Sequence, residues 1–283
     1  MTGTGGASIH RFRVGRFECV ALDDGTIVYT ADQYFANAPP EELAAALARH
    51  GLERDRIPSP YTCLLVDTGS HRVVIDTGGA GLAPGVGRFA ESFAATGVDP
   101  GDVDWLVLTH GHPDHIGGNL DASGEPRFPE ARVAMWSDEW EYWTSEPTLA
   151  GDPFADTARR NLPPLRDRME LFTEEAEIVP GVRALPAPGH TVGHMAVAVQ
   201  SDGEELLYIS DAALHPLHLE HPDWLTVFEA DPARALDSRR RLCERAATTG
   251  ALVLAFHFDP FPSLGRIRTA PGGWTWQPVL RSG

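Results

Sequence analysis

The chain has few cysteines, no long apolar run and little positive charge, and each absence excludes a class of protein. Its three cysteines, Cys19, Cys63 and Cys243, stand far apart among 283 residues. An odd number of isolated cysteines is typical of buried reduced thiols and not of a disulfide framework or a cysteine-based zinc site. No apolar run approaches the roughly 20 residues that a membrane-spanning helix needs, so we expect no membrane partner.

Acidic residues outnumber basic ones by 40 to 23, which gives a formal net charge of −17. Nucleic acids bind surfaces rich in lysine and arginine, so we expect no nucleic-acid partner. The first ten residues are rich in glycine, threonine and serine and lack the basic and apolar regions of a secretion signal. This start favours a cytoplasmic location. The apolar share of 42% is that of an ordinary globular protein.

Strand and helix signals alternate along the chain and predict one α/β domain over residues 1–283. Its N-terminal part, residues 1–60, is expected to hold strands at 12–14, 17–22 and 26–30, with a turn at 23–25, and a helix over 40–49. Residues 119–180 read as an irregular insertion, rich in proline and scattered charge, that forms a pocket wall or a lid.

The densest chemistry lies in the stretch Thr109-His-Gly-His-Pro-Asp-His115, directly after the apolar run 105–108. Three imidazoles and a carboxylate within six residues are difficult to explain by packing. Three other predicted strands also end in a possible ligand, namely His190, Asp211 and His257. Strand ends are where loops converge in layered α/β folds, so we expect these side chains to meet.

Seven nitrogen and oxygen ligands without cysteine are typical of two zinc-like ions, since one tetrahedral site needs only four. The spacing assigns His110 and His112, with His190, to one ion. Asp114 and His115 lie beyond Pro113 and face a second ion, which His257 completes. Asp211 is the expected bridge. Asp114 is also the expected catalytic residue, because it can orient the nucleophilic water and carry its proton.

Further residues are expected around this centre. Asp76, at the end of the strand over 72–76, is predicted to orient a metal-bound imidazole, with an Asx-type turn as the alternative. His194 is expected to support the site from behind the ligands. The residues predicted to wall a substrate pocket are Trp136, Trp140, Trp143, His215, Trp224 and Phe228. The three tryptophans at 136–143 are spaced for one face of a helix, which is also the pattern of a core stripe.

These motifs closely resemble those of the metallo-β-lactamase superfamily. Its His-x-His-x-Asp-His signature matches residues 110–115, and its later elements match Gly189-His-Thr-x-Gly-His194, Asp211 and His257. The resemblance implies a four-layer αββα sandwich with a dinuclear site at one edge. Within the family, the chain is most similar to the quorum-quenching lactonase and methyl parathion hydrolase branch. It departs from the lactonases after Asp211, where Ala-Ala-Leu-His replaces a segment that commonly holds a tyrosine, so the methyl-parathion-like relatives fit better.

We therefore expect a dinuclear zinc hydrolase that uses a metal-bridging hydroxide on a small ester, lactone or phosphotriester. Two alternatives stay open. One is a thioesterase or β-lactam-type hydrolase of a biosynthetic pathway, with the same metals and another pocket. The other is a mononuclear iron oxidoreductase of the persulfide dioxygenase type. A homodimer is an assembly compatible with either class.

Overall fold

The computed structural model describes residues 8–279, apart from the side chains of Pro147 and Leu149. The ends of the predicted domain, 1–7 and 280–283, lie outside the described residues. One sheet has the order β1 (Ile9–Val14), β2 (Phe17–Tyr29), β3 (Ile57–Asp67), β4 (Arg72–Ile75), β5 (Trp105–Val107), β6 (Arg132–Trp136), β7 (Met169–Phe172). The other has the order β14 (Gly273–Pro278), β13 (Leu264–Ala270), β12 (Leu252–Ala255), β11 (Glu204–Ser210), β10 (Met195–Ser201), β9 (Val182–Pro186), β8 (Ala176–Val179).

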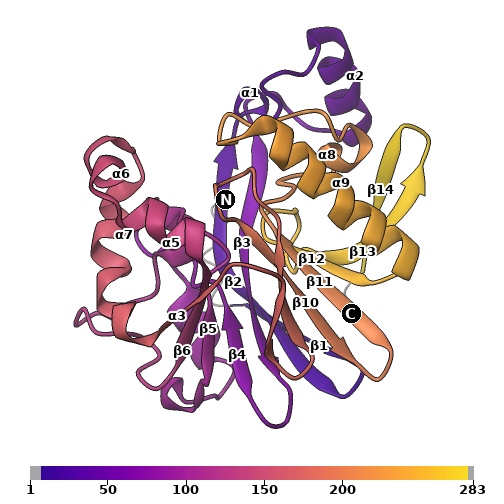
Figure 1. The fold of residues 1–283 in the computed structure, drawn as a ribbon. Helices are drawn as coiled ribbons and strands as arrows, with labels where there is room; N and C mark the ends of the chain where they lie inside the picture. Colours follow the sequence, from indigo (N-terminus) through magenta and orange to yellow (C-terminus); the bar gives the residue numbers. More distant parts are fainter. Residues whose placement is uncertain (1–7, 280–283) are drawn as a thin grey trace.

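Helices lie outside these two sheets (Figure 1). They are α1 (Ala31–Tyr34), α2 (Pro40–His50), α3 (Phe89–Ala94), α4 (Pro113–Ile116), α5 (Ser137–Thr144), α6 (Glu146–Gly151), α7 (Ala155–Asn161), α8 (Leu217–Glu220) and α9 (Pro232–Thr249), with 3-10 turns η1 (Pro100–Asp102) and η2 (Pro163–Arg168). The two longest are α2, which confirms the helix expected over 40–49 with one residue more at its end, and α9. Proline opens each of them, and a glycine in the left-handed conformation, Gly51 or Gly250, ends it.

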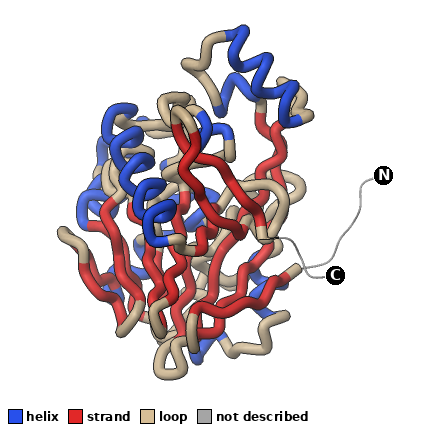
Figure 2. Tube along the Cα trace, turned by 90° about the vertical axis from the view of Figure 1, so that its right-hand side faces the viewer, coloured by secondary structure: helices blue, strands red, loops and turns tan. Residues whose placement is uncertain are grey.

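The alternation of side chains along the strands produces four layers. On β10, Val197 and Val199 pack into the core between the two sheets, whereas Ala196 and Ala198 belong to a second core beneath α9. Successive strand residues point to opposite faces, so one strand serves both cores. On the outer side of the first sheet, α3 contacts β2 and α5 contacts β6 and β7. The predicted αββα sandwich is confirmed, and Figure 2 views it from the side that carries α9.

Two local predictions are wrong. Residues 23–25 do not form a turn, because β2 continues through them to Tyr29 with a shift of register between Asp23 and Gly25. Gly25 takes a positive φ of 114° there, and the Asp23 carboxylate accepts its N–H at 2.9 Å. The residues that predicted a turn therefore form a bulge inside a long strand.

The second wrong prediction concerns the insertion over 119–180. Residues 132–172 form β6, α5, α6, α7, η2 and β7, so most of the segment is regular structure. Three of the prolines that suggested irregularity, Pro147, Pro163 and Pro164, lie at the first turns of α6 and η2, where a missing N–H costs nothing. Within residues 8–279, no helix is both long and apolar enough to cross a membrane.

Candidate metal centre

The first group of candidate ligands comes from the loop after β5 and the loop after β9. The distance from His112 Nδ1 is 3.0 Å both to His110 Nε2 and to His190 Nε2. Burial and the neighbouring imidazoles lower the pKa of His110 and His112, so both rings stay neutral. Imidazole nitrogens that converge in this way can direct their lone pairs at a single cation.

The second group lies on the other side of Asp211. The distance from His257 Nε2 to Asp114 Oδ2 is 3.5 Å, and His115 Nε2 lies 3.8 Å from the same oxygen. The short helix α4 explains why neighbouring motif residues face different groups. Pro113 opens α4, so the chain turns after His112 and carries Asp114 and His115 away from the first group.

Asp211 belongs to both groups. Its Oδ2 lies 3.3 Å from His190 Nε2 and 3.2 Å from His257 Nε2, and its Oδ1 lies 3.2 Å from His115 Nε2. The four ligand atoms of each group, His110/His112/His190/Asp211 and Asp114/His115/His257/Asp211, lie within 4.8 Å of one another. This placement agrees with the pairing that the sequence predicts, with Asp211 in the bridging position.

The residues fit a pair of divalent cations. Among the described side chains, His115 Nε2 and Asp211 Oδ1 are buried and lie 3.2 Å apart without the geometry of a hydrogen bond, and a buried polar atom left in this way costs free energy. Both atoms point into the second group. Imidazole and carboxylate ligands also match the donor preferences of zinc and similar divalent ions. The surroundings of His190 also favour positive charge. Burial lowers its pKa, but hydrogen bonds with Asp211 and Glu229 outweigh burial and raise the pKa to about 10.

Asp76 and His194 lie where the sequence places them. Asp76 Oδ2 accepts hydrogen bonds from Thr109 Oγ1 at 2.8 Å and from the Tyr208 hydroxyl at 3.0 Å, and lies 2.8 Å from His115 Nδ1. It therefore fixes the His115 ring with Nε2 turned inward. His194 Nε2 accepts the backbone N–H of Asp211 at 3.1 Å and so holds the bridging position from behind. The Asp76 backbone, with φ at 59°, is left-handed, a strained geometry that this network maintains.

Sequence reasoning missed two residues that contact the outer nitrogens of the ligands. Glu229 Oε2 lies 3.2 Å from His190 Nδ1, and its other oxygen accepts a hydrogen bond from Arg239 at 3.0 Å. Ser59 Oγ lies 2.8 Å from His257 Nδ1 and accepts a hydrogen bond from the Tyr34 hydroxyl at 2.6 Å. Neither lies near a ligand in the sequence, so spacing carried no signal for them.

A third missed residue, Glu139 on α5, connects the two ligand loops. Its side chain is fully buried and accepts hydrogen bonds from the N–H of Gly111 at 2.9 Å, the N–H of Gly193 at 2.8 Å and the Trp143 indole at 2.6 Å. Gly111 lies between His110 and His112, and Gly193 precedes His194. One carboxylate thus sets the distance between the loops. Burial raises the pKa of Glu139, and these donors lower it in part.

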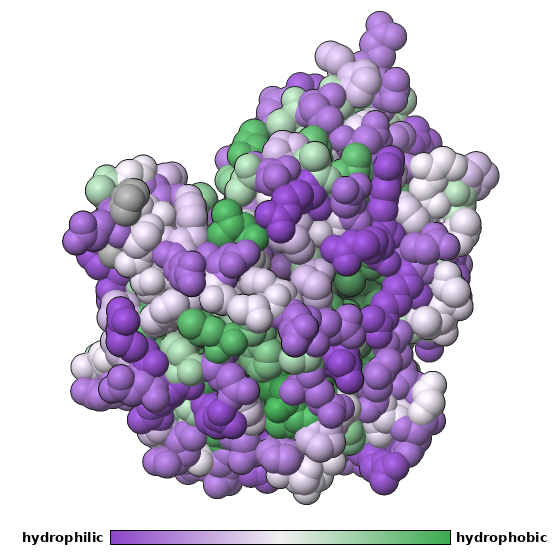
Figure 3. Space-filling model, in the orientation of Figure 1, coloured by the Kyte–Doolittle hydropathy of each residue, from purple (hydrophilic) through white to green (hydrophobic). Residues whose placement is uncertain are grey.

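A cavity of about 260 Å³ opens onto the candidate ligands. Apart from the ligands, its wall consists of Ile27, Tyr29, Gln33, Leu82, Pro113, Phe154, Leu214 and Phe228. Figure 3 shows hydrophobic surface in the notch between the α5–α7 helices and the α1–α2 end of the molecule. The cavity is therefore mainly apolar, with the polar ligands at its base.

Of the six residues predicted to wall this pocket, Phe228 does so and the other five are not among its lining residues. Trp136, Trp140 and Trp143 are buried in the core, as the core-stripe alternative predicts. Trp143 still matters for the site, because its ring lies edge-on to His112 with centroids 5.7 Å apart. The remaining two, His215 and Trp224, pack edge-to-face or tilted on Phe35 beneath α1 and α8.

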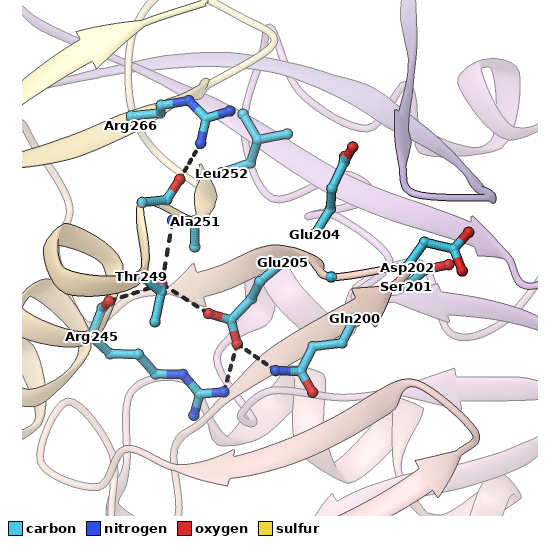
Figure 4. Close-up of a pocket in the computed structure, with 12 residues that line it drawn as sticks. Gln200, Ser201, Asp202, Glu204, Glu205, Arg245, Thr249, Ala251, Leu252 and Arg266 are labelled. Atoms are coloured by element: carbon cyan, nitrogen blue, oxygen red, sulfur yellow. Dashed lines mark hydrogen bonds and ion pairs between the residues drawn. The ribbon is translucent and has the colours of Figure 1, made fainter.

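A larger hollow of about 920 Å³ lies at the opposite end of the second sheet, between the β10–β11 turn and the end of α9. Its polar groups satisfy one another. Glu205 accepts hydrogen bonds from Arg245, Gln200 and Thr249, and Arg266 donates to the backbone oxygen of Gly250 (Figure 4). It contains none of the candidate ligands, so its size does not make it the reactive site.

Comparisons with known proteins agree with this geometry. The family model of the metallo-beta-lactamase superfamily matches residues 56–256. The N-acyl homoserine lactonase AiiA of Bacillus thuringiensis subsp. kurstaki is 26% identical over 210 residues, 65% of this chain and 76% of that protein. The N-acyl homoserine lactonase AttM of Azorhizobium caulinodans is 31% identical over 190 residues, 63% of this chain and 66% of its own length.

Solved structures share the fold over nearly the whole chain. The structure of AidC, a dizinc quorum-quenching lactonase, superposes with a TM-score of 0.89 at 24% identity, covering 98% of this chain and 99% of that one. The hydrolase AbOPH of the β-lactamase superfamily gives a TM-score of 0.90 at 24% identity, covering 99% and 100%. The matched residues make up most of the chain and include every candidate ligand except His257, which follows directly. The chain therefore belongs to the metallo-β-lactamase superfamily of metal-dependent hydrolases.

Proposed function

We propose that the protein is a dinuclear zinc hydrolase that opens a lactone or cleaves an ester of a small molecule with an apolar substituent. The observation that carries this proposal is the sharing of Asp211 by two groups of ligands, all buried except the partly exposed His112, at the base of a mainly apolar cavity. The similarity to lactonases supports the choice of a lactone or ester bond.

Each part of the site has a task in such a reaction. His110, His112 and His190 would hold one ion, Asp114, His115 and His257 the other, and Asp211 both. The chemistry that zinc would supply when bound there is a lowered pKa of bound water, towards about 7, and polarisation of the substrate oxygen. Asp114 lines the cavity, so its carboxylate can orient the attacking water and take up its proton.

The apolar wall determines how the substrate enters. Phe154 and Phe228 lie on the wall with Ile27, Leu82 and Leu214, so an apolar substituent can be buried there while the polar bond reaches the ligands. Burial of the substituent fixes the orientation of the bond and removes water from around it. A substrate without an apolar part would lose most of this binding free energy.

The test is a turnover screen of zinc-loaded protein against lactones, aryl esters, thioesters, phosphotriesters and β-lactams, with metal content measured on the same sample. We expect about two zinc ions per chain and the highest kcat/KM on lactones or esters. The Asp211→Asn variant is the matched control, because it keeps the side-chain shape and removes the shared charge. Inactivity on all lactones and esters would refute the proposal, and one bound iron with oxygen consumption would favour the dioxygenase alternative.

A further inference from the structure

The cavity wall has few polar groups besides the candidate ligands. Among the residues that line it, Tyr29 and Gln33 are the polar exceptions. The carbonyl oxygen of the Gln33 side chain already accepts hydrogen bonds from the backbone N–H and the hydroxyl of Thr30, at 3.0 and 3.2 Å. Tyr29 comes from the last position of β2, far in sequence from every candidate ligand.

The Tyr29 hydroxyl has a defined neighbour. It lies 2.7 Å from the hydroxyl of Tyr61, whose side chain is fully buried. Within the described part of the chain, Tyr29 is the hydrogen-bond partner of the Tyr61 hydroxyl. A buried O–H without an acceptor costs free energy, so Tyr61 donates and Tyr29 accepts. The proton of Tyr29 is then directed away from Tyr61 and is available to a molecule in the cavity.

We propose, on the basis of the hydrolase function proposed above, that Tyr29 is a catalytic residue. Its hydroxyl donates a hydrogen bond to the substrate oxygen that gains negative charge when water adds to the carbonyl carbon, and Tyr61 aims that hydroxyl. No proton is transferred in this role. Donors that point at developing charge in a dry site give some of the largest single contributions to catalysis.

The contacts around Tyr29 hold its hydroxyl in place as a hydrogen-bond donor. The Tyr29 ring stacks on Tyr34 with centroids 4.9 Å apart and lies edge-on to Phe228 at 6.0 Å, so the ring cannot swing freely. Burial raises the pKa of Tyr29 and the nearby Asp114 raises it further, so the hydroxyl keeps its proton. In the segment after Asp211, Leu214 lines the same wall. No described residue of that segment places a hydroxyl in the cavity.

The test compares Tyr29→Phe with Tyr142→Phe. Both variants lose one phenol hydroxyl, but Tyr142 lies on α5 outside the cavity and bonds to Asp152. We expect Tyr29→Phe to lower kcat by about 10- to 100-fold on the best substrate of the screen, with KM and metal content near wild type. Tyr142→Phe should stay within about twofold of wild type. Phenylalanine keeps the ring contacts of Tyr29, so a loss is assigned to the hydroxyl.

Two further measurements separate this inference from the proposed function. Wild-type turnover alone tests the function. An alkylphosphonate, which has the shape and charge of the tetrahedral intermediate, tests Tyr29 by calorimetry without turnover, and Tyr29→Phe should weaken its binding by about tenfold or more. Tyr61→Phe should cause a smaller loss than Tyr29→Phe in both assays. Unchanged kcat and phosphonate binding in Tyr29→Phe, or an equal or larger loss in Tyr61→Phe, would overturn the proposal.

Discussion

Replacing Glu229 by glutamine removes the charge that links His190 to the buried Arg239. The two Glu229 oxygens lie 3.2 Å from His190 Nδ1 and 3.0 Å from an Arg239 nitrogen, and all three side chains are almost fully buried. Glutamine has the same shape but only one acceptor oxygen, so its amide group must face one of two N–H donors. Whichever way the amide turns, His190 loses the charged acceptor that holds its ring with Nε2 toward the first group, and Arg239 loses its counter-charge.

The size of both effects follows from general values for such contacts. Loss of a partner that orients a metal-bound histidine costs about 10- to 100-fold in metal affinity, or about 1.4–2.7 kcal/mol. Removal of one member of a buried ion pair costs about 3–5 kcal/mol of stability. We therefore expect Glu229→Gln to weaken the binding of one of the two zinc ions by about 10- to 100-fold. We also expect it to lower the free energy of unfolding, even in the metal-free protein.

Zinc titration against a chromophoric chelator measures the first effect, and urea unfolding in excess chelator measures the second. Arg239→Met separates them. That variant leaves the carboxylate of Glu229 in place for His190, so stability should fall while zinc affinity stays within a few fold of wild type. Glu205→Gln is the control, since Glu205 also pairs with an arginine of α9, Arg245 at 2.6 Å, but contacts no ligand. Unchanged zinc affinity in Glu229→Gln would refute the reasoning.

Three other changes give distinct outcomes. Asp211→Asn should reduce bound metal at both positions, measured by elemental analysis, whereas Asp114→Asn should affect one; equal losses would contradict the shared position of Asp211. Gly111→Ala places a methyl group 2.2 Å from the Trp143 ring, so we expect thermal unfolding to report a loss of about 1–3 kcal/mol together with weaker metal binding; normal values would show that the loop can move. Burial lowers the pKa of His215 to about 3, below the unfolded value near 6.5, so its contribution to stability is complete above about pH 6.5 and is lost as pH falls towards 3. His215→Asn keeps an acceptor for the Leu217 N–H and should flatten the fall in unfolding free energy between pH 6 and 4; an unchanged slope would show that this residue does not titrate there.

The candidate metal ligands could be predicted because their donor side chains are closely spaced in the sequence. Residues 110–115 carry four donor side chains within one loop, and Pro113 separates them into two groups whatever the rest of the fold. His190, Asp211 and His257 each follow a predicted strand, and strand ends share an edge. Both features, the spacing within 110–115 and the position of each other ligand after a strand, involve residues that are close in the sequence. The αββα sandwich was implied by the resemblance to the family, and the alternating strand and helix pattern agreed with it.

The pocket wall could not be predicted in this way. Tryptophan spacing identified the buried face of a helix. It could not distinguish core from cavity wall, because an indole ring packs well in both. Trp140 and Trp143 lie in the core. The residues that do approach the ligands carry no such local signal. Tyr29 lies 81 residues before His110, and Glu229 lies 39 residues after His190, the ligand that it contacts.

The sequence by itself determined the donor set of a candidate site for two divalent ions and roughly where it lies, because metal ligands are defined by their donor atoms and close spacing. Only the tertiary structure decided what surrounds these ligands. Packing of β2 beside β3 puts Tyr29 against Tyr61, and the loop before α9 puts Glu229 against His190. Such contacts arise from the register of strands and the docking of a helix, which depend on the packing of the whole chain at once.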